Sequence, residues 1–309
     1  MYNGYGVHHI AIGVRDLESM RAFYRDVLEF TDIFVDFPEA EYPALCEVVR
    51  APRPVYAAVL FSQAAGGIIV ELVRMAEPNP RPIRKDFRYG DIGLASLAIP
   101  VPDVDRFHKE FSGRVAFCSE PKSAVIPRWG DCRFVFCRDP EGNLIEFLSG
   151  AGIPASGRFG GVRWVGISVT DLDRSIRFYQ KHGGFDIVAV DAHEKFSGHV
   201  DEVSGAGQTR VRSCVLASSA AEGMVELIEV LEPRGRSIPF GVRWGDFGFL
   251  QVCLNGRQGD DVFLMAAEFE NEGIEFMSGP QLMGDERQGA FFYAKDPDGI
   301  PVEFLVFLK

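Results

Sequence analysis

The sequence lacks several features that would assign it to a common functional class. No run of 18 or more apolar residues occurs in its 309 residues, so we expect no transmembrane helix. The first five residues contain neither a basic region nor an apolar run, so we expect no signal peptide. A Gly-rich phosphate loop, a nucleophile elbow and zinc-knuckle spacing are also missing. The sequence therefore gives no support to nucleotide binding, serine hydrolysis or a zinc finger.

Positive charge is scarce as well. There are 32 Lys and Arg residues against 44 Asp and Glu, a net charge of −12, which argues against nucleic acid or an anionic membrane as the main partner. The six cysteines show no metal-knuckle pair and mostly lie in apolar stretches, a pattern typical of buried free thiols in a reducing compartment. We therefore expect a cytoplasmic globular protein that acts on a small molecule, with homodimerisation left open.

Residues 7–14 alternate between two kinds of side chain, which predicts a half-buried strand. One face carries the bulky Ile10 and Ile12 and should pack on a helix. The other face carries His9 and then two very small residues, which should leave room for a ligand beside the imidazole. Asp16 is expected to cap the helix that follows, because apolar residues recur at helical spacing after it.

The same pattern returns later in the chain. Pairs that lie 155 positions apart are Asp16 and Asp171, Tyr24 and Tyr179, and Glu71 and Glu226. The Asp-Pro-Glu-Gly motif at 139–142 and the Asp-Pro-Asp-Gly motif at 296–299 are 157 apart, as are Glu146 and Glu303. A constant offset over so many positions indicates a duplication, with about two residues inserted late in the second copy.

Each copy is itself double, with a strand, a helix and further strands occurring twice. In the first copy we expect strands at 7–14, 55–61, 68–73, 93–101, 115–118, 133–137 and 143–148, with helices after Asp16 and Asp103. In the second we expect strands at 162–169, 186–190, 210–217, 224–230, 248–254, 274–277, 290–294 and 302–307, with a helix at about 260–271. Residues 149–161 read as a linker between domains 1–150 and 160–309. Two long stretches, 37–54 and 192–209, are expected to be irregular lids or mobile segments.

Three of these motifs carry a family resemblance. The opening HHIAIGVRDL with its later FY, the VEL strand and the DPEGNLIEF ending resemble the vicinal oxygen chelate superfamily, which includes glyoxalase I, methylmalonyl-CoA epimerase, bleomycin-resistance proteins and extradiol dioxygenases. The resemblance covers nearly the whole chain. It implies an α+β fold of four βαβββ units in two domains, with each pair of units forming a cup-shaped, partly open β-barrel.

The resemblance also implies where a metal would bind. In such families one residue from the first strand and one from the last strand of each of two paired units hold the metal. The first-strand positions here are His9, Ser96, Trp164 and Gln251, and the last-strand positions are Glu71, Glu146, Glu226 and Glu303. Each glutamate is a single carboxylate in an apolar strand, which is costly unless the charge is paired or bound to a metal.

The site therefore depends on which units pair. Units one and two, units three and four, or units one and four are the alternatives, and the last gives the most complete set: His9, Glu71, Gln251 and Glu303. One imidazole, one amide oxygen and two carboxylates suit a divalent ion such as Zn, Ni, Co, Mn or Fe. The cup that remains would hold Ser96, Glu146, Trp164 and Glu226, and we expect it to be inactive because Trp164 fills space instead of coordinating.

The expected chemistry is metal-assisted proton transfer, as in an isomerase, epimerase or lyase acting on a small oxygenated, in some cases aromatic, carbonyl compound. In this scheme His9, Gln251 and Glu303 hold the metal, Glu71 is a fourth ligand or the base, and the two glutamates are the catalytic residues. One alternative is an extradiol-type dioxygenase, which would need a second histidine such as His193 or His199 at the metal. The other is a metal-free, ligand-sequestering protein of the bleomycin-resistance type.

Overall fold

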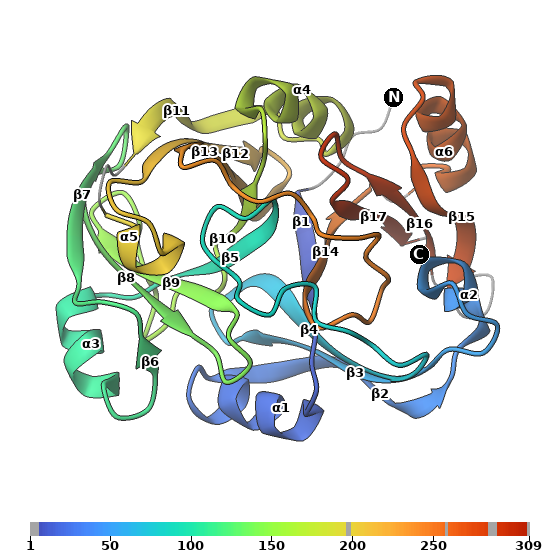
Figure 1. Ribbon diagram of the computed structural model, residues 1–309, viewed down its shortest axis with the longest axis horizontal. Coiled ribbons are helices and arrows are strands. Elements are labelled where there is room, and N and C mark those ends of the chain that lie inside the picture. Colours follow the sequence, from blue (N-terminus) through green and yellow to red (C-terminus); the bar gives the residue numbers. More distant parts are fainter. Residues whose placement is uncertain (1–5, 196–198, 257–258, 284–288, 308–309) are drawn as a thin grey trace.

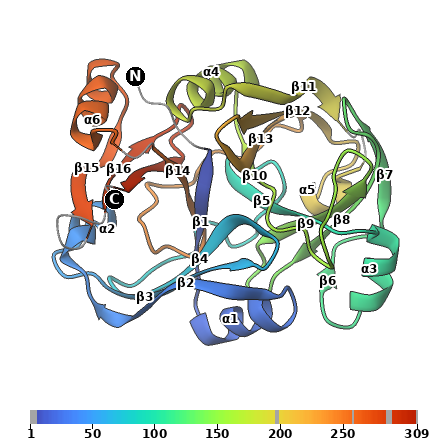
Figure 2. The same ribbon diagram turned by 180° about the vertical axis from the view of Figure 1, so that it is seen from behind.

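Two curled sheets lie side by side, with the four longer helices against their outer faces (Figures 1 and 2). The computed structural model describes residues 6–195, 199–256, 259–283 and 289–307. Both sheets combine parallel and antiparallel strands. None of the helices in these described segments has the length and apolar character needed to cross a membrane.

The chain forms the four predicted βαβββ units. Unit one contains β1 (Val7–Gly13), α1 (Leu17–Asp26), β2 (Phe30–Glu41), η1 (Pro43–Leu45), α2 (Cys46–Val49), β3 (Val55–Gln63) and β4 (Gly66–Glu77). Unit two contains β5 (Gly93–Pro100), α3 (Val104–Phe111), β6 (Ala116–Phe117), β7 (Lys122–Ile126), β8 (Gly130–Arg138) and β9 (Leu144–Gly150). Unit three contains β10 (Trp164–Ser168), α4 (Leu172–His182), β11 (Ile187–Lys195), α5 (Asp201–Ser204), β12 (Arg210–Ser218) and β13 (Ala221–Glu232). Unit four contains β14 (Gly248–Asn255), α6 (Val262–Asn271), β15 (Phe276–Met283), β16 (Gly289–Lys295) and β17 (Pro301–Phe307).

Units pair across the two halves of the chain. The eight-stranded sheet has the order β15-β16-β17-β14-β1-β4-β3-β2 and so joins unit one to unit four. The nine-stranded sheet runs β11-β12-β13-β10-β5-β9-β8-β6, with β7 beside β8, and joins unit two to unit three. In each sheet the first strands of the two units are antiparallel neighbours. Each sheet thus draws one unit from each half, and the treatment of 1–150 and 160–309 as separate domains stays a prediction.

The outer face of β1 packs as its sequence predicts. Ile10 and Ile12 are fully buried and belong to the same apolar core as Leu17 and Met20 of α1. The Asp16 side chain accepts a hydrogen bond from the backbone N–H of Ser19 at 3.0 Å, which confirms the helix cap. Asp103, Asp171 and Asp261 cap α3, α4 and α6 in the same way.

The expectation of two long irregular regions is wrong at both places. Residues 37–41 extend β2, an edge strand whose side chains are mostly exposed, so that no buried face marks it in the sequence. The short helices α2 and α5 lie 155 positions apart within these regions, and their valines are buried in the interiors of the two sheets. Residues 196–198 of the second region lie outside the described residues. A role of either region as a lid stays a prediction.

Two crossing segments, residues 78–92 and 233–247, carry the chain from one sheet to the other and are tied together by buried carboxylates. Asp91 accepts hydrogen bonds from Nε and Nη2 of Arg236, at 2.7 and 2.6 Å. Asp246, 155 positions later, accepts from the backbone N–H of Arg81 and of Arg243, both at 3.0 Å. Each carboxylate is therefore bound by a residue from the other half of the chain.

The repeated Phe-Tyr and Asp-Pro-x-Gly motifs bind each other. The Tyr24 hydroxyl of α1 donates to Asp139 at 3.3 Å, and the Tyr179 hydroxyl of α4 donates to Asp296 at 3.2 Å. All four side chains are buried, and each tyrosine lies one unit before the aspartate that it binds. These contacts hold unit one to unit two and unit three to unit four.

Removing either hydroxyl should destabilise the fold. We expect Tyr24→Phe and Tyr179→Phe each to lower the free energy of unfolding by about 0.5–3 kcal/mol, the range that covers hydrogen bonds to neutral and to charged groups. Urea unfolding followed by circular dichroism measures this. Tyr42→Phe is the matched control, because that hydroxyl donates to the carbonyl of Pro38 in an exposed bond. A loss no larger than that of the control would contradict this role for the motif.

Asp296 should also make stability depend on pH. Burial raises the pKa of its carboxyl to about 7, although backbone N–H groups and Tyr179 donate to it. Because this pKa lies above the ordinary value of 3.8, the folded protein holds the proton more tightly than the unfolded chain. The contribution of Asp296 to stability is therefore full below about pH 4 and is lost as the pH rises through about 7. We expect Asp296→Asn to show a smaller fall in unfolding free energy than the parent between about pH 5 and 8, and equal falls would refute this.

Candidate metal centre

The eight-stranded sheet gathers all four residues predicted for the metal. His9 lies on β1, Glu71 on β4, Gln251 on β14 and Glu303 on β17, and β1 and β14 are direct neighbours. Each of the four is buried, with at most 6% of its surface exposed. In the register, Ala11 of β1 faces both Glu71 and Gln251. The pairing of units one and four thus brings together side chains that are up to 294 positions apart in the sequence.

These side chains contact one another directly. His9 Nε2 lies 3.4 Å from Glu71 Oε2 and 3.2 Å from Glu303 Oε2. The Gln251 amide donates from Nε2 to Glu303 Oε2 at 2.6 Å. Burial by itself lowers the pKa of His9, but contacts with Cys253, Glu303 and Glu71 raise it well above its usual value. His9 therefore supplies the positive charge that these two buried carboxylates need.

The donor set fits a divalent cation. Two ligand atoms at about 2.1 Å from one ion, at angles between about 90° and 109°, are about 3.0–3.4 Å apart. Each separation between His9 Nε2 and a carboxylate oxygen lies in or close to this range. Gln251 Oε1 is buried and has no hydrogen-bond partner among the described residues, which leaves its lone pairs available. Imidazole nitrogen with carboxylate and amide oxygens suits a transition ion of borderline hardness.

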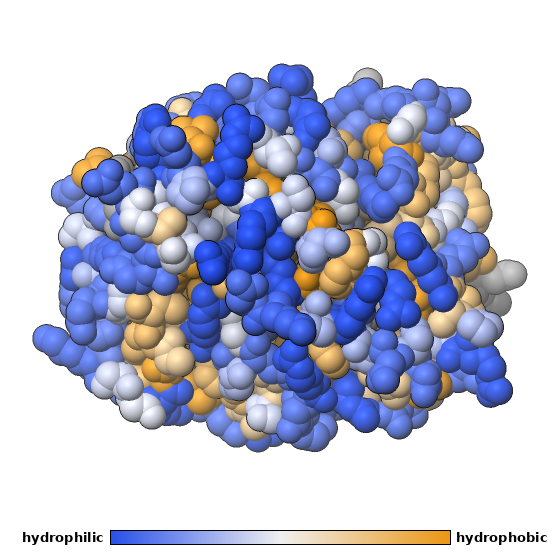
Figure 3. All heavy atoms as spheres, in the orientation of Figure 1, coloured by the Kyte–Doolittle hydropathy of each residue, from blue (hydrophilic) through white to orange (hydrophobic). Residues whose placement is uncertain are grey.

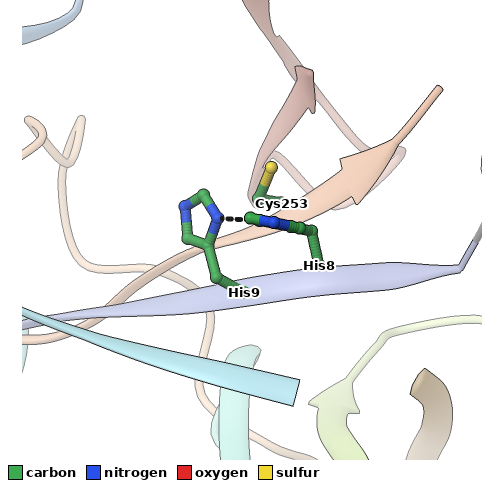
Figure 4. Close-up of side chains that lie close together, drawn as sticks. All are labelled: His8, His9 and Cys253. Carbon is green, nitrogen blue, oxygen red and sulfur yellow. Dashed lines mark hydrogen bonds between the residues drawn. The ribbon is translucent and has the colours of Figure 1, made fainter. Parts of the chain in front are cut away.

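The other side of the His9 ring faces two residues that the motif positions did not include (Figure 4). His9 Nδ1 lies 2.9 Å from His8 Nδ1, and the thiol of Cys253 lies close to both rings. One ligand atom from each of His8, His9 and Cys253 lies within 4.8 Å of the other two. Burial, and next the neighbouring His9, lower the pKa of His8 to about 3, so the His8 ring is neutral. The His8 ring also lies 5.4 Å from the ring of Phe307.

Cys253 and two tyrosines were missed as site residues. Cys253 occupies the position two residues after Gln251, which is filled by Ala11, Ala98 and Gly166 in the other units, so the repeat register could have identified it. Burial raises the pKa of its thiol to about 12. Tyr56 of β3 and Tyr293 of β16 are buried, and burial together with Glu71 and Glu303 raises the pKa of both phenols. No motif marks these tyrosines, since they lie on strands that carry none of the predicted positions.

The room expected beside the small residues of β1 is partly filled. A Cβ atom at Gly13 would lie 1.9 Å from the backbone oxygen of Asp246, because the second crossing segment passes over the strand there. Ala11 packs in one apolar cluster with Trp244 and Leu250. The room predicted beside the small residues next to His9 is therefore filled by backbone at Gly13.

The nine-stranded sheet gathers the other four motif positions. Ser96, Glu146, Trp164 and Glu226 are all buried there, and these positions include no imidazole. The Trp164 ring is 2% exposed and lies 5.4 Å from that of Trp129. His193 and His199 contact this part of the molecule: His193 bonds the backbone oxygen of Asp191, and the His199 ring lies 6.1 Å from that of Phe134. Neither histidine is part of the His9 cluster.

Trp164 should serve stability and not metal binding. Because the side chain is almost fully buried, we expect Trp164→Ala to lower the free energy of unfolding by about 3–5 kcal/mol. Denaturant titration measures this, and elemental analysis of the folded fraction should show an unchanged metal content. A metal bound beside Trp164 would contradict the assignment of the metal centre to the eight-stranded sheet.

Comparisons with known proteins agree with this architecture. The chain is 29% identical to the uncharacterized protein YaeR of Escherichia coli over 140 residues, which is 45% of this chain and 92% of the relative. The crystal structure of glyoxalase I from Zea mays superposes with a TM-score of 0.62 at 17% identity, covering 97% of this chain and 92% of that one. A putative dioxygenase from Bacillus subtilis gives 0.59 at 14% identity, covering 100% and 87%.

These two solved structures establish the fold and leave the reaction open. The comparison with protein families is more specific, because one family description matches both copies of the repeat, residues 6–147 and 161–304. Together with the four βαβββ units and the glutamates in their last strands, this match shows that the chain belongs to the Glyoxalase/Bleomycin resistance protein/Dioxygenase superfamily.

Proposed function

We propose that this protein is a metal-dependent enzyme of the glyoxalase type, an isomerase, epimerase or lyase that moves a proton on a small oxygenated carbonyl compound. His9, Gln251 and Glu303 would hold a divalent ion, with Glu71 as a fourth ligand or as the base. The antiparallel pairing of β1 with β14 is the observation that carries the proposal, because it places these residues in one buried cluster. The superfamily contains enzymes of several classes, so the argument for this reaction comes from the site.

The chain's own residues supply most of what such a reaction needs. A divalent ion, when bound, would polarise a substrate oxygen as a Lewis acid. Glu71 would accept a proton from the adjacent carbon, and its contact with His9 at the inner face of the sheet supports this role. The phenols of Tyr56 and Tyr293 remain protonated at neutral pH and can donate hydrogen bonds to an oxygen that gains negative charge.

The surroundings of the site favour a substrate with an apolar part. Tyr56, Trp244, Phe291 and Tyr293 belong to the apolar cluster that lines the inner face of the eight-stranded sheet. Such a lining excludes water, which strengthens the interaction of Glu71 with a substrate proton. It is also compatible with an aromatic group on the carbonyl compound.

The dioxygenase alternative is less well supported by the arrangement. It needs two histidines and a carboxylate at one metal, and His193 and His199 lie with the nine-stranded sheet. The metal-free binding alternative predicts that the protein purifies without metal and acquires none. Metal analysis and oxygen uptake, measured on the same purified protein, therefore distinguish both alternatives from the proposed function.

The metal ligands can be tested by comparing substitutions at two glutamates that occupy equivalent positions in the two sheets, Glu303 and Glu146. The protein is purified without chelator, loaded separately with Zn, Mn, Ni, Co or Fe(II), desalted and analysed for metal. We expect His9→Ala and Glu303→Ala to lose the metal, because each removes a ligand from the cluster. Glu146→Ala should retain it, since Glu146 occupies the equivalent position of β9 in the other sheet.

The opposite result has a clear meaning. If Glu146→Ala abolished metal binding and Glu303→Ala left it intact, the site would lie in the other sheet and the proposal would fail. A parent protein that binds none of these metals would favour the sequestering alternative. Exchange of a substrate C–H proton with deuterated water, tested on a panel of hydroxy- and oxo-carbonyl compounds, should require both the metal and Glu71. Oxygen uptake on catechols with Fe(II), without such exchange, would favour the dioxygenase.

A further inference from the structure

A cavity of about 490 Å³ lies between the two sheets, where the crossing segments meet. Its walls include residues at matching positions of the two halves, such as Ile83 and Ile238, Phe87 and Val242, and Leu94 and Phe249, each pair 155 apart. The cavity therefore lies where equivalent segments of the two halves meet. His9, Glu71, Gln251 and Glu303 do not line it, so it is separate from the candidate metal centre.

The charge on its walls breaks this symmetry. Five basic residues line the cavity, and all of them come from the first half of the chain: Arg15, Arg84, Lys85, Arg88 and Arg138. Arg243 and Lys295 are the second-half counterparts of Arg88 and Arg138, and neither of them lines it. Three acidic residues, Asp86, Glu141 and Glu202, share the lining. A wall with this excess of positive charge is notable in a protein of net charge −12.

Three of the five cations already have carboxylate partners. Arg15 pairs with Glu141 at 3.1 Å, and Arg88 pairs with Asp86 at 3.6 Å. Arg84 lies 3.6 Å from Asp91.

The other two cations are available for a ligand. Arg138 donates to the backbone oxygens of Gly142 and Phe87, at 2.6 and 3.1 Å, and makes no ion pair within the described part of the chain. Lys85 is exposed and likewise forms no ion pair there. Within the described residues, neither side chain has a carboxylate partner at ion-pair distance, so both can pair with the anionic group of a ligand.

Apolar residues from both halves of the chain also line the cavity. Ile238, Val242, Phe247 and Phe249 face the cavity from the second crossing segment and the start of β14. Figure 3 shows strongly hydrophilic side chains beside apolar ones at the middle of the molecular surface. A lining that combines cations with apolar side chains is complementary to a ligand that carries an anionic group and an apolar body.

We propose that this cavity binds a small amphipathic organic anion. The anionic group lies at Lys85 and Arg138, because a charge-assisted hydrogen bond from an unpaired cation is the strongest contact that the cavity offers. The apolar or aromatic body packs on Val242 and Phe249. The volume is in the range of small-molecule sites, about 300–1,000 Å³. The site is independent of the proposed function, since it uses none of the candidate metal ligands.

The test uses two fluorescent probes of nearly equal shape. Anilinonaphthalene sulfonate is an amphipathic anion, and phenylnaphthylamine is its uncharged counterpart. Binding to the full chain is titrated at low salt for the parent and four variants: Lys85→Gln, Arg138→Gln, Val242→Ser and Lys295→Gln. Lys295 is the matched control, because it is the repeat counterpart of Arg138 outside the cavity.

The expected pattern distinguishes charge from apolar contact. Lys85→Gln and Arg138→Gln should each weaken binding of the sulfonate about tenfold, since each removes a hydrogen bond to a charged group. They should leave the uncharged probe unaffected. Val242→Ser should weaken both probes, and Lys295→Gln should weaken neither. The metal content should be the same in all of these variants.

Two outcomes would overturn the proposal. One is sulfonate binding that is unchanged in both charge variants, and the other is a loss in Lys295→Gln as large as that in Lys85→Gln. If Arg138→Gln fails to fold because it loses its two backbone bonds, Lys85→Glu still decides the question, since Lys85 is exposed and makes no ion pair with the described residues. That charge reversal should abolish sulfonate binding, and retention of the parent affinity would refute the site.

Discussion

The antiparallel pairing of β1 with β14 is the constraint on which the candidate site depends. Each of these strands has its own last strand as a parallel neighbour, β4 for β1 and β17 for β14. The pairing therefore lines up four strands, each with one polar side chain on the inner face. Burying two carboxylates there is costly, and contact with His9 offsets part of that cost. A site built in this way is suited to binding a cation that can replace the proton on His9.

Besides forming the candidate site, the pairing of units across the two halves requires the crossing segments. Since unit one joins unit four and unit two joins unit three, the chain must pass between the sheets twice. Asp91 and Asp246 fix these passages by binding groups from the opposite half. The segments then occupy the space over Gly13 and enclose a cavity between them. The same topology thus fills part of the space beside β1 and creates the cavity where equivalent segments of the two halves meet.

The duplication has left two equivalent frameworks with different contents. All four units keep a buried glutamate in the last strand, and the helix caps and the Tyr–Asp contacts recur in both halves. The first-strand positions have diverged, with His9 and Gln251 in one sheet and Ser96 and Trp164 in the other. A bulky indole at 2% exposure fills the position where an imidazole stands in the eight-stranded sheet. Divergence at a few inner-face positions is therefore enough to separate a candidate metal centre from a packed interior.

The sequence by itself determined the four units, the helix-packed face of β1 and the helix cap at Asp16, and the family resemblance supplied the eight motif positions. These features depend on local periodicity, on short-range capping and on a constant repeat offset, all of which are visible in one dimension. The edge strand β2 could not be predicted in this way, because most of its side chains face solvent and show no buried face. Tyr56 and Tyr293 were missed because packing alone places them beside Glu71 and Glu303. Three unit pairings fitted the sequence, and only the tertiary structure decided between them. The pairing of β1 with β14 is a contact between segments about 240 positions apart. Backbone hydrogen bonds between strands can form with any strand of suitable length, so the local sequence does not determine which distant strand is the partner.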